Sequence, residues 1–128
     1  MIVADTSALI AILLGQPEAH VCATMLEAEP EIAISAGTMA EALIVADRRG
    51  VGAEMAALIE GIGIIAMPLS PADAGRVADA YSRWGKGVHP AGLNFGDCFA
   101  YALATKLNVP LLYVGRDFAQ TDVKAALI

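Results

Sequence analysis

The sequence contains little cysteine, little histidine and few basic residues, and each shortage argues against a class of protein. Its two cysteines, Cys22 and Cys98, form no CxxC pair and have no histidine at metal-ligand spacing, so we expect buried free thiols and no zinc site. There are 8 Lys and Arg against 14 Asp and Glu, giving a formal net charge of −6. A protein that coats nucleic acid would be basic overall, whereas an acidic enzyme with a local basic cluster is compatible with this charge.

Long hydrophobic runs are also missing. The longest, residues 8–14, ends at a polar break over 15–18, whereas a membrane-spanning helix needs about 20 apolar residues. The N-terminus has neither the basic segment nor the cleavage site of a signal peptide, so we expect a cytoplasmic protein with no membrane partner. Because 57% of the residues are nonetheless hydrophobic, we expect part of the apolar surface to meet another protein chain.

Strand-like and helix-like segments alternate along the chain. The expected strands cover residues 1–5, 32–35, 64–67 and 111–114, with a last edge strand at 123–127. The expected helices cover residues 6–14, 18–28, 38–49, 51–60, 71–84 and 95–107, and residues 85–92 form the one long irregular loop. This alternation predicts an α/β fold with a central, mostly parallel β-sheet of about four to five strands, flanked by helices on both faces, in a single domain over residues 1–128.

Four acidic residues lie close to the ends of these strands. Asp5 follows the first strand directly, Glu41 comes shortly after the second, and Asp117 follows the fourth. Because ligands of open parallel sheets bind outside the carboxyl ends of the strands, we expect these three acids at one edge of the sheet. Asp97 lies in the first turn of the helix after the irregular loop and can reach the same edge.

Each acid also has a local explanation, and these alternatives stay open. Asp5 suits the N-cap of the first helix, and Glu41 suits a capping box of the form T-x-x-E over residues 38–41. Asp97 would be the third residue of a helix capped by Asn94, and Asp117 would be an ordinary turn residue.

The four acids together favour a metal site. Several carboxylates in one cleft repel one another unless something neutralises them. Carboxylate oxygens suit the hard ions Mg²⁺ and Mn²⁺. A carboxylate-bound Mg²⁺ with open coordination positions can polarise a phosphodiester and activate a water molecule. The residues alone therefore favour a site that handles phosphate groups.

Several segments carry a resemblance to a known family. They are M-I-V-A-D-T-S-A-L at residues 1–9, the helix bearing Glu41, L-N-F-G-D-C-F-A-Y-A-L-A at residues 93–104, and L-L-Y-V-G-R-D-F at residues 111–118, followed by T-D at 121–122. With these motifs the chain resembles, over essentially its whole length, the PIN-domain ribonuclease toxins of bacterial VapBC type II toxin–antitoxin systems. The resemblance implies a single PIN domain.

The resemblance also assigns roles to residues. It implies that the four acids form one catalytic site, with Asp5 and Asp97 as the principal ligands of Mg²⁺, for which Mn²⁺ can substitute. Thr6 or Ser7 would support the site by hydrogen bonding near Asp5. Asp122 would lie beside the metal or behind its ligands.

The activity implied is that of a metal-dependent endoribonuclease. Such an enzyme would hydrolyse RNA phosphodiester bonds with a metal-activated water. Similar toxins cut structured RNAs such as tRNA or rRNA and so block translation. A cognate VapB-type antitoxin would neutralise the enzyme by inserting a peptide segment beside the active site, and the toxin is expected to be a homodimer.

Three basic residues are candidate contacts to RNA phosphates. Lys86 and His89 lie in the irregular loop, and Arg116 directly precedes Asp117. Phosphate contacts position a strand without reading its sequence. The alternative is that these side chains are simply solvated.

Two other functions compete with this interpretation. A phosphoacceptor receiver domain would have a second acid beside Asp5 and a lysine after a late strand, whereas the chain has Thr6 and Arg116 at these places. A non-catalytic interaction module would share the scaffold but show no Mg²⁺-dependent cleavage of RNA.

Overall fold

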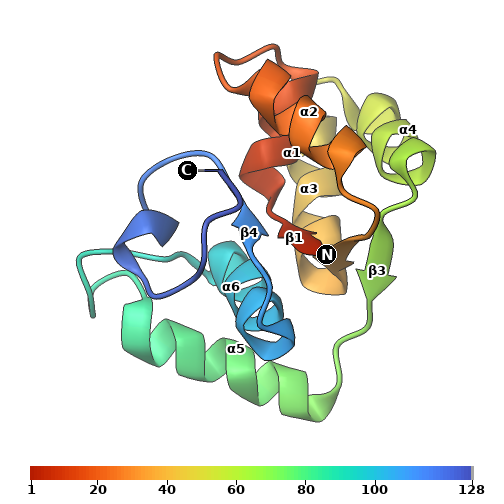
Figure 1. Ribbon diagram of the computed structural model, residues 1–128. Coiled ribbons are helices and arrows are strands. Elements are labelled where there is room, and N and C mark those ends of the chain that lie inside the picture. Colours follow the sequence, from red (N-terminus) through yellow and green to blue (C-terminus); the bar gives the residue numbers. More distant parts are fainter. Residues whose placement is uncertain (128) are drawn as a thin grey trace.

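The computed structural model describes residues 1–127, which form one β-sheet and the helices around it (Figure 1). The strands are β1 (Ile2–Ala4), β2 (Ile32–Ser35), β3 (Ile65–Met67) and β4 (Leu111–Leu112). The helices are α1 (Thr6–Leu13), α2 (Ala19–Ala28), α3 (Ala36–Arg48), α4 (Gly52–Ile62), α5 (Pro71–Trp84), α6 (Phe95–Leu107) and the short 3₁₀ helix η1 (Phe118–Gln120). The expected helices and first four strands are confirmed, with ends that differ by at most two residues.

All four strands are parallel and lie in the order β3-β2-β1-β4. β1 is a central strand, with Ile2 paired to Ile32 of β2 and Val3 paired to Leu111 of β4. The predicted α/β fold with a parallel sheet is therefore confirmed. Because the strands are parallel, the residues that follow their carboxyl ends, Asp5 among them, lie along one edge of the sheet.

The prediction of an edge strand over residues 123–127 was wrong in its extent. The chain makes one isolated parallel bridge here, between Leu111 and Ala125. Leu111 donates its N–H to the Lys124 carbonyl at 2.8 Å, and Ala126 donates to the Leu111 carbonyl at 2.9 Å. Since β4 has only two residues, no longer ladder is available for a fifth strand to follow.

Helices cover both faces of the sheet, as predicted (Figure 1). Successive residues of a strand point to opposite faces. Ile2 and Ala4 pack into an apolar cluster with side chains of α1, α2, α3 and α4, whereas Val3 packs into a second cluster with α5 and α6. Asp5, the residue after β1, therefore lies where the two apolar clusters on opposite faces of the sheet meet.

The start of α3 corrects one expectation about Glu41. Ser35 caps this helix, because its Oγ accepts the Gly37 N–H at 3.2 Å. The helix consequently begins two residues earlier than expected, and Thr38 lies inside it with a buried hydroxyl. The predicted capping box over residues 38–41 was therefore wrong, and Glu41 is free of any capping role.

The shortages noted in the sequence have structural counterparts. Cys22 and Cys98 are buried free thiols, as expected. Burial raises the pKa of the Cys98 thiol to about 11, with a smaller contribution from the charge of Asp97, so this thiol is unreactive. None of the helices within residues 1–127 is both long and apolar enough to span a bilayer.

Candidate active site

Asp5 is the most deeply buried of the four acids, with 2% of its surface exposed. Its Oδ2 accepts hydrogen bonds from the Ser7 N–H at 3.0 Å and from Ser7 Oγ at 2.6 Å, and so caps α1. Its Oδ1 is buried without a hydrogen-bond partner among residues 1–127. The pKa of Asp5 is raised to about 7: burial is the main cause, the Ser7 hydrogen bonds act against it, and the charges of Asp97 and Glu41 add to it. Such a carboxyl group needs a proton or a cation.

Ser7 joins this acid to the other end of the chain. Its Oγ accepts the Val114 N–H at 2.9 Å while donating to Asp5. Asp5 itself donates its N–H to the Leu112 carbonyl at 3.0 Å. The segment after β4, which carries Asp117, is thereby held against the first acid.

Asp97 lies in the first turn of α6 and completes a capping box with Asn94. Its N–H donates to Asn94 Oδ1 at 2.8 Å, and its Oδ2 accepts the Asn94 N–H at 3.0 Å. Burial raises the pKa of Asp97, the bond from Asn94 lowers it, and the charges of Glu41 and Asp117 raise it. The predicted cap at Asn94 is confirmed, and the acid also lies within electrostatic range of the other carboxylates.

Glu41 projects from the second turn of α3 toward α1 and α6. Its Oε1 accepts a hydrogen bond from Thr6 Oγ1 at 2.6 Å. Its other oxygen lies directly against Gly96 of α6. Thr6 therefore supports Glu41, while Ser7 is the residue that supports Asp5.

Three of the acids line one hollow of about 250 Å³. Asp5 and Asp97 form part of its wall, together with exposed Asp117 at the start of η1. The wall also includes Ser7, Asn94 and the segment 114–118. Within residues 1–127, neither these three acids nor Glu41 form an ion pair with a basic side chain. The hollow thus collects negative charge that nothing in the described chain balances by direct contact.

The candidate phosphate contacts differ in position. Arg116 lines the acidic hollow. His89 packs edge-on against Trp84, with ring centres 4.7 Å apart, and its Nδ1 accepts the Ala91 N–H at 3.0 Å. Lys86 is exposed on the same loop. Arg116 is therefore the one of the three that borders the acids.

The Asp122 side chain is bound to residues outside the acidic hollow. Its Oδ1 accepts a hydrogen bond from the Tyr101 hydroxyl, and its Oδ2 pairs with Arg83 at 3.6 Å. The Tyr101 oxygen also accepts from Trp84 Nε1 at 2.9 Å. These contacts attach the C-terminal segment to α5 and α6. Asp122 does not line the hollow.

The donor set fits a hard divalent cation. Within residues 1–127 no three His, Cys, Asp or Glu side chains lie together in a group that could hold a metal ion. Mg²⁺ does not require one, because it keeps several water ligands and is typically bound through one or two carboxylates. The unpartnered Oδ1 of Asp5 and the carboxylate of Asp97, on the wall of the same hollow, supply that number.

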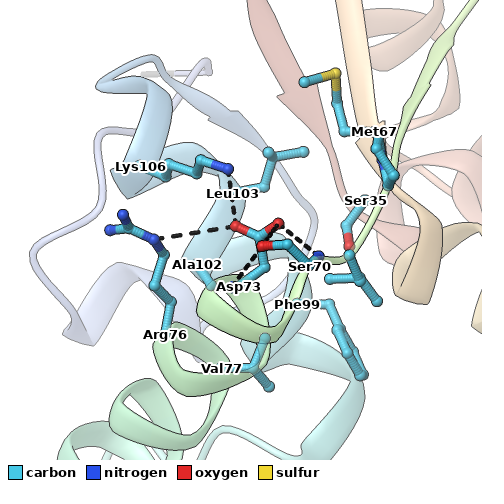
Figure 2. A pocket seen from close by; sticks show the side chains of 12 residues that line it. Ser35, Met67, Ser70, Asp73, Arg76, Val77, Phe99, Ala102, Leu103 and Lys106 are labelled. Atoms are coloured by element: carbon cyan, nitrogen blue, oxygen red, sulfur yellow. Dashed lines mark hydrogen bonds and ion pairs between the residues drawn. The ribbon is translucent and has the colours of Figure 1, made fainter.

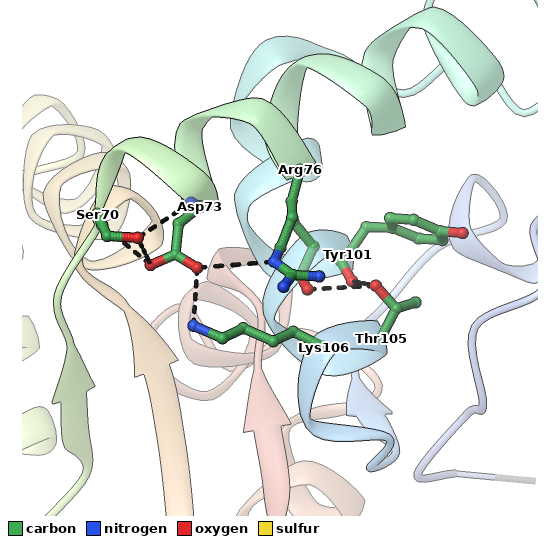
Figure 3. Close-up of polar contacts among 7 residues, drawn as sticks. Ser70, Asp73, Arg76, Tyr101, Thr105 and Lys106 are labelled. Carbon is green, nitrogen blue, oxygen red and sulfur yellow. Dashed lines mark hydrogen bonds and ion pairs between the residues drawn. The ribbon is translucent and has the colours of Figure 1, made fainter.

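A second hollow, of about 320 Å³, differs in its electrostatics (Figure 2). It lies where α5 and α6 meet the end of β3. Its acid, Asp73, pairs with Lys106 Nζ at 2.8 Å and with Arg76 Nε at 4.0 Å (Figure 3). The hydrogen bond from Lys106 and those from Ser70 lower the pKa of Asp73 to about 2. Because the charge of Asp73 is already paired with Lys106 and Arg76, we interpret this acid as structural.

Two features of the site were missed by sequence reasoning. The partner of Thr6 is Glu41, 35 residues away, and no local pattern marks that pairing. Gly96 lies against the Glu41 carboxylate, where a side chain would collide with it. The sequence did offer one signal for this contact. Gly96 directly precedes Asp97 in the first turn of a helix, where the backbone conformation does not require a glycine.

Comparison with known proteins matches residues 2–124 to the PIN domain. Ribonuclease VapC of Mycolicibacterium smegmatis is 41% identical over 128 residues, covering 96% of this chain and 98% of that protein. Ribonuclease VapC30 of Mycobacterium tuberculosis is 40% identical over 126 residues, covering 94% and 95%.

Solved structures with the same fold include two from toxin–antitoxin systems. Mycobacterium tuberculosis VapC20, described as a sarcin-ricin loop cleaving toxin, superposes with a TM-score of 0.77 at 16% identity, covering 96% of each chain. A toxin–antitoxin complex from Klebsiella pneumoniae gives a TM-score of 0.71 at 22% identity, covering 95% of this chain and 93% of that one. At these identities the likeness concerns the fold.

Proposed function

Since the chain belongs to the PIN-domain family and, within it, to the VapC group, we propose that it is a metal-dependent endoribonuclease and the toxin of a type II toxin–antitoxin system. The observation that carries this proposal is the acidic hollow. A buried carboxylate with an unpartnered oxygen shares it with two further acids, none of which is paired with a basic side chain in residues 1–127.

The side chains would hold a divalent ion in a defined place. Asp5 and Asp97 would bind it, with Mg²⁺ as the ion and Mn²⁺ as a substitute. Ser7 fixes Asp5 Oδ2 and leaves Oδ1 free, and the Asn94 N–H fixes one oxygen of Asp97. Bound there, the ion would polarise a phosphodiester and lower the pKa of a water nucleophile.

Glu41 and Asp117 would complete the site. Thr6 holds the Glu41 carboxylate, whose charge is felt by both Asp5 and Asp97. Asp117 lies exposed on the hollow, where it can accept a proton from an attacking water or orient it. Arg116, beside it, would attract the RNA backbone, with Lys86 and His89 contacting phosphates farther along the strand.

The substrate would be a structured RNA of translation, such as tRNA or rRNA, and cleavage would block protein synthesis in the cytoplasm. Of the alternatives, a receiver domain disagrees with the family, and a non-catalytic module leaves unexplained four acids that have no ion-pair partner in the described part of the chain. A VapB-type antitoxin would neutralise the enzyme by occupying the region beside the hollow.

The apolar surface supports a homodimer. A groove of about 530 Å³ between α5 and α6 is lined almost wholly by apolar side chains, among them Leu69, Tyr81 and Phe95. Phe95 is 68% exposed, which is unusual for so large an apolar side chain. A second copy of the chain would cover this groove. Sedimentation of the wild type beside Phe95→Glu tests this, with a shift to monomer expected for the variant.

The decisive experiment identifies cleaved RNA. Wild type and Asp97→Asn are each expressed briefly, and the 5′ ends of total RNA are sequenced. We expect new ends at a small number of sites with the wild type and none with the variant, together with loss of cleavage by the purified enzyme in a metal chelator. Identical ends for both proteins would refute the proposal.

A further inference from the structure

Helices α3 and α6 approach each other through two glycines, each of which receives a side chain from the other helix. Gly37 of α3 lies under the ring of Phe99, so that a methyl group there would come within 2.5–2.8 Å of ring atoms. Gly96 of α6 lies under the carboxylate of Glu41, so that a methyl group there would overlap Oε2 and lie 2.5 Å from Cδ.

The two contacts differ in what would have to move. The Phe99 ring is large and packed into the second apolar cluster, and it also meets Phe95 edge-on with ring centres 4.8 Å apart. The Glu41 carboxylate is the far end of a flexible side chain. A methyl group at residue 96 could therefore be accommodated by moving Glu41, at small loss of stability, whereas one at residue 37 would disturb the packing.

The backbone at Gly96 does not explain the glycine. Its φ is not positive, unlike that of Gly63 or Gly92, so an L side chain fits the backbone conformation. Alanine has the highest intrinsic helix propensity, and glycine has the lowest of any residue except proline. The missing side chain thus makes α6 weaker and makes room for one carboxylate oxygen.

We propose that Gly96 is a positioning residue for Glu41: the gap at residue 96 and the hydroxyl of Thr6 together fix the Glu41 carboxylate beside Asp5 and Asp97. Thr6 Oγ1 holds Oε1 at 2.6 Å, and the Gly96 backbone limits where Oε2 can lie. This inference rests on the proposed function, because it assigns the gap a role in that same acidic site.

The test compares Gly96→Ala with Gly75→Ala. Gly75 lies inside α5 with nothing within 4 Å of the added methyl group, so it reports the effect of alanine in open space. Gly96→Ala should lower kcat for RNA cleavage about 100-fold, as expected for a displacement of about 1 Å, with little change in KM. Gly75→Ala should leave both constants unchanged.

A second measurement does not depend on catalysis. Gly96→Ala is combined with Glu41→Ala, which removes the colliding carboxylate, and Mn²⁺ affinity and Tm are measured for all four proteins of the cycle. Gly96→Ala should weaken Mn²⁺ binding several-fold when Glu41 is present and have no effect when it is absent. It should also raise Tm by about 2–5 °C more in the Glu41→Ala background.

The outcomes separate this inference from the proposed function. If Gly96→Ala cleaves RNA as fast as Gly75→Ala, or weakens Mn²⁺ binding equally in both backgrounds, the positioning role is wrong while the ribonuclease stands. If wild type neither cleaves RNA nor binds Mn²⁺, the proposed function fails, and the positioning role fails with it.

Discussion

Helices α5 and α6 begin with the same capping box, and the two boxes have opposite electrostatics. In α5, Asp73 donates its N–H to Ser70 Oγ at 3.1 Å and accepts the Ser70 N–H at 2.9 Å. In α6, Asp97 and Asn94 make the equivalent bonds at 2.8 and 3.0 Å. Judged by these local bonds alone, the two aspartates are interchangeable.

Their longer-range neighbours differ. Asp73 meets Lys106 and Arg76, and its pKa falls to about 2, first of all through the Lys106 hydrogen bond. Asp97 forms no ion pair with a basic side chain within residues 1–127, and its pKa is raised by burial and by the charges of Glu41 and Asp117. The comparison teaches that a helix cap becomes a candidate ligand when its charge is left without a partner.

The largest expected effect comes from removing the unbalanced charge. Asp97→Asn should reduce RNA cleavage at least about 100-fold, because a metal ligand is lost. Its Tm should be unchanged or higher, because the amide oxygen of Asn can still accept the Asn94 N–H and repulsion among the acids is relieved. Cleavage of a labelled RNA and thermal denaturation measure the two effects. A large fall in Tm would instead make Asp97 a structural residue like Asp73.

A smaller effect is expected from the support of Asp5. Ser7→Ala removes a hydrogen bond of 2.6 Å to Asp5 and one of 2.9 Å from Val114. Loss of such an outer partner typically reduces metal affinity or activity about 10–100-fold. Titration calorimetry with Mn²⁺, alongside an activity assay, should detect it. Unchanged affinity would mean that the hydroxyl only joins the two ends of the chain.

Supplying the missing cation should stabilise the acidic site. At a free Mn²⁺ concentration ten times Kd, binding adds about 1.4 kcal/mol to the free energy of unfolding. Tm should therefore rise for wild type and not for Asp5→Asn. Equal shifts in both proteins would indicate ions bound elsewhere on the acidic surface.

The paired box should behave in the opposite way. Asp73→Asn should leave RNA cleavage unchanged and lower Tm, because Lys106 loses its partner while the cap persists. The pKa of Asp73 lies below its ordinary 3.8, so its contribution to stability is present above about pH 4 and is lost as the pH falls toward 2. The difference in stability between wild type and Asp73→Asn should accordingly shrink over that range. A difference independent of pH would exclude the ion pair as its cause.

Much of this could be predicted from residues close together in sequence. Alternating strands and helices indicated a parallel sheet, and Asn94 with Asp97 indicated a cap. What could not be predicted are pairings between distant residues, such as Thr6 with Glu41 and Asp73 with Lys106, which are 35 and 33 residues apart. Such pairs depend on how two helices pack against each other, and no local sequence pattern predicts that packing.

Local reasoning also failed in specific places. The T-x-x-E pattern at residues 38–41 suggested a cap, yet Ser35 starts the helix first, because its hydroxyl lies at the end of β2 and reaches the Gly37 N–H. The strand expected over residues 123–127 could not form beside a two-residue β4. In both cases a neighbouring element decided the outcome.

The order of strands in the sheet has a consequence for synthesis of the protein. β1 lies between β2 and β4, and its pairing with β4 requires residues 111 and 112, which are made more than a hundred residues later. Ser7 reaches Val114, and Asp117 follows a few residues later. A growing chain therefore cannot assemble the acidic hollow until residues 111–117 have emerged. For an enzyme whose proposed targets are the RNAs of translation, this order of assembly would delay activity until residues 111–117 have left the ribosome.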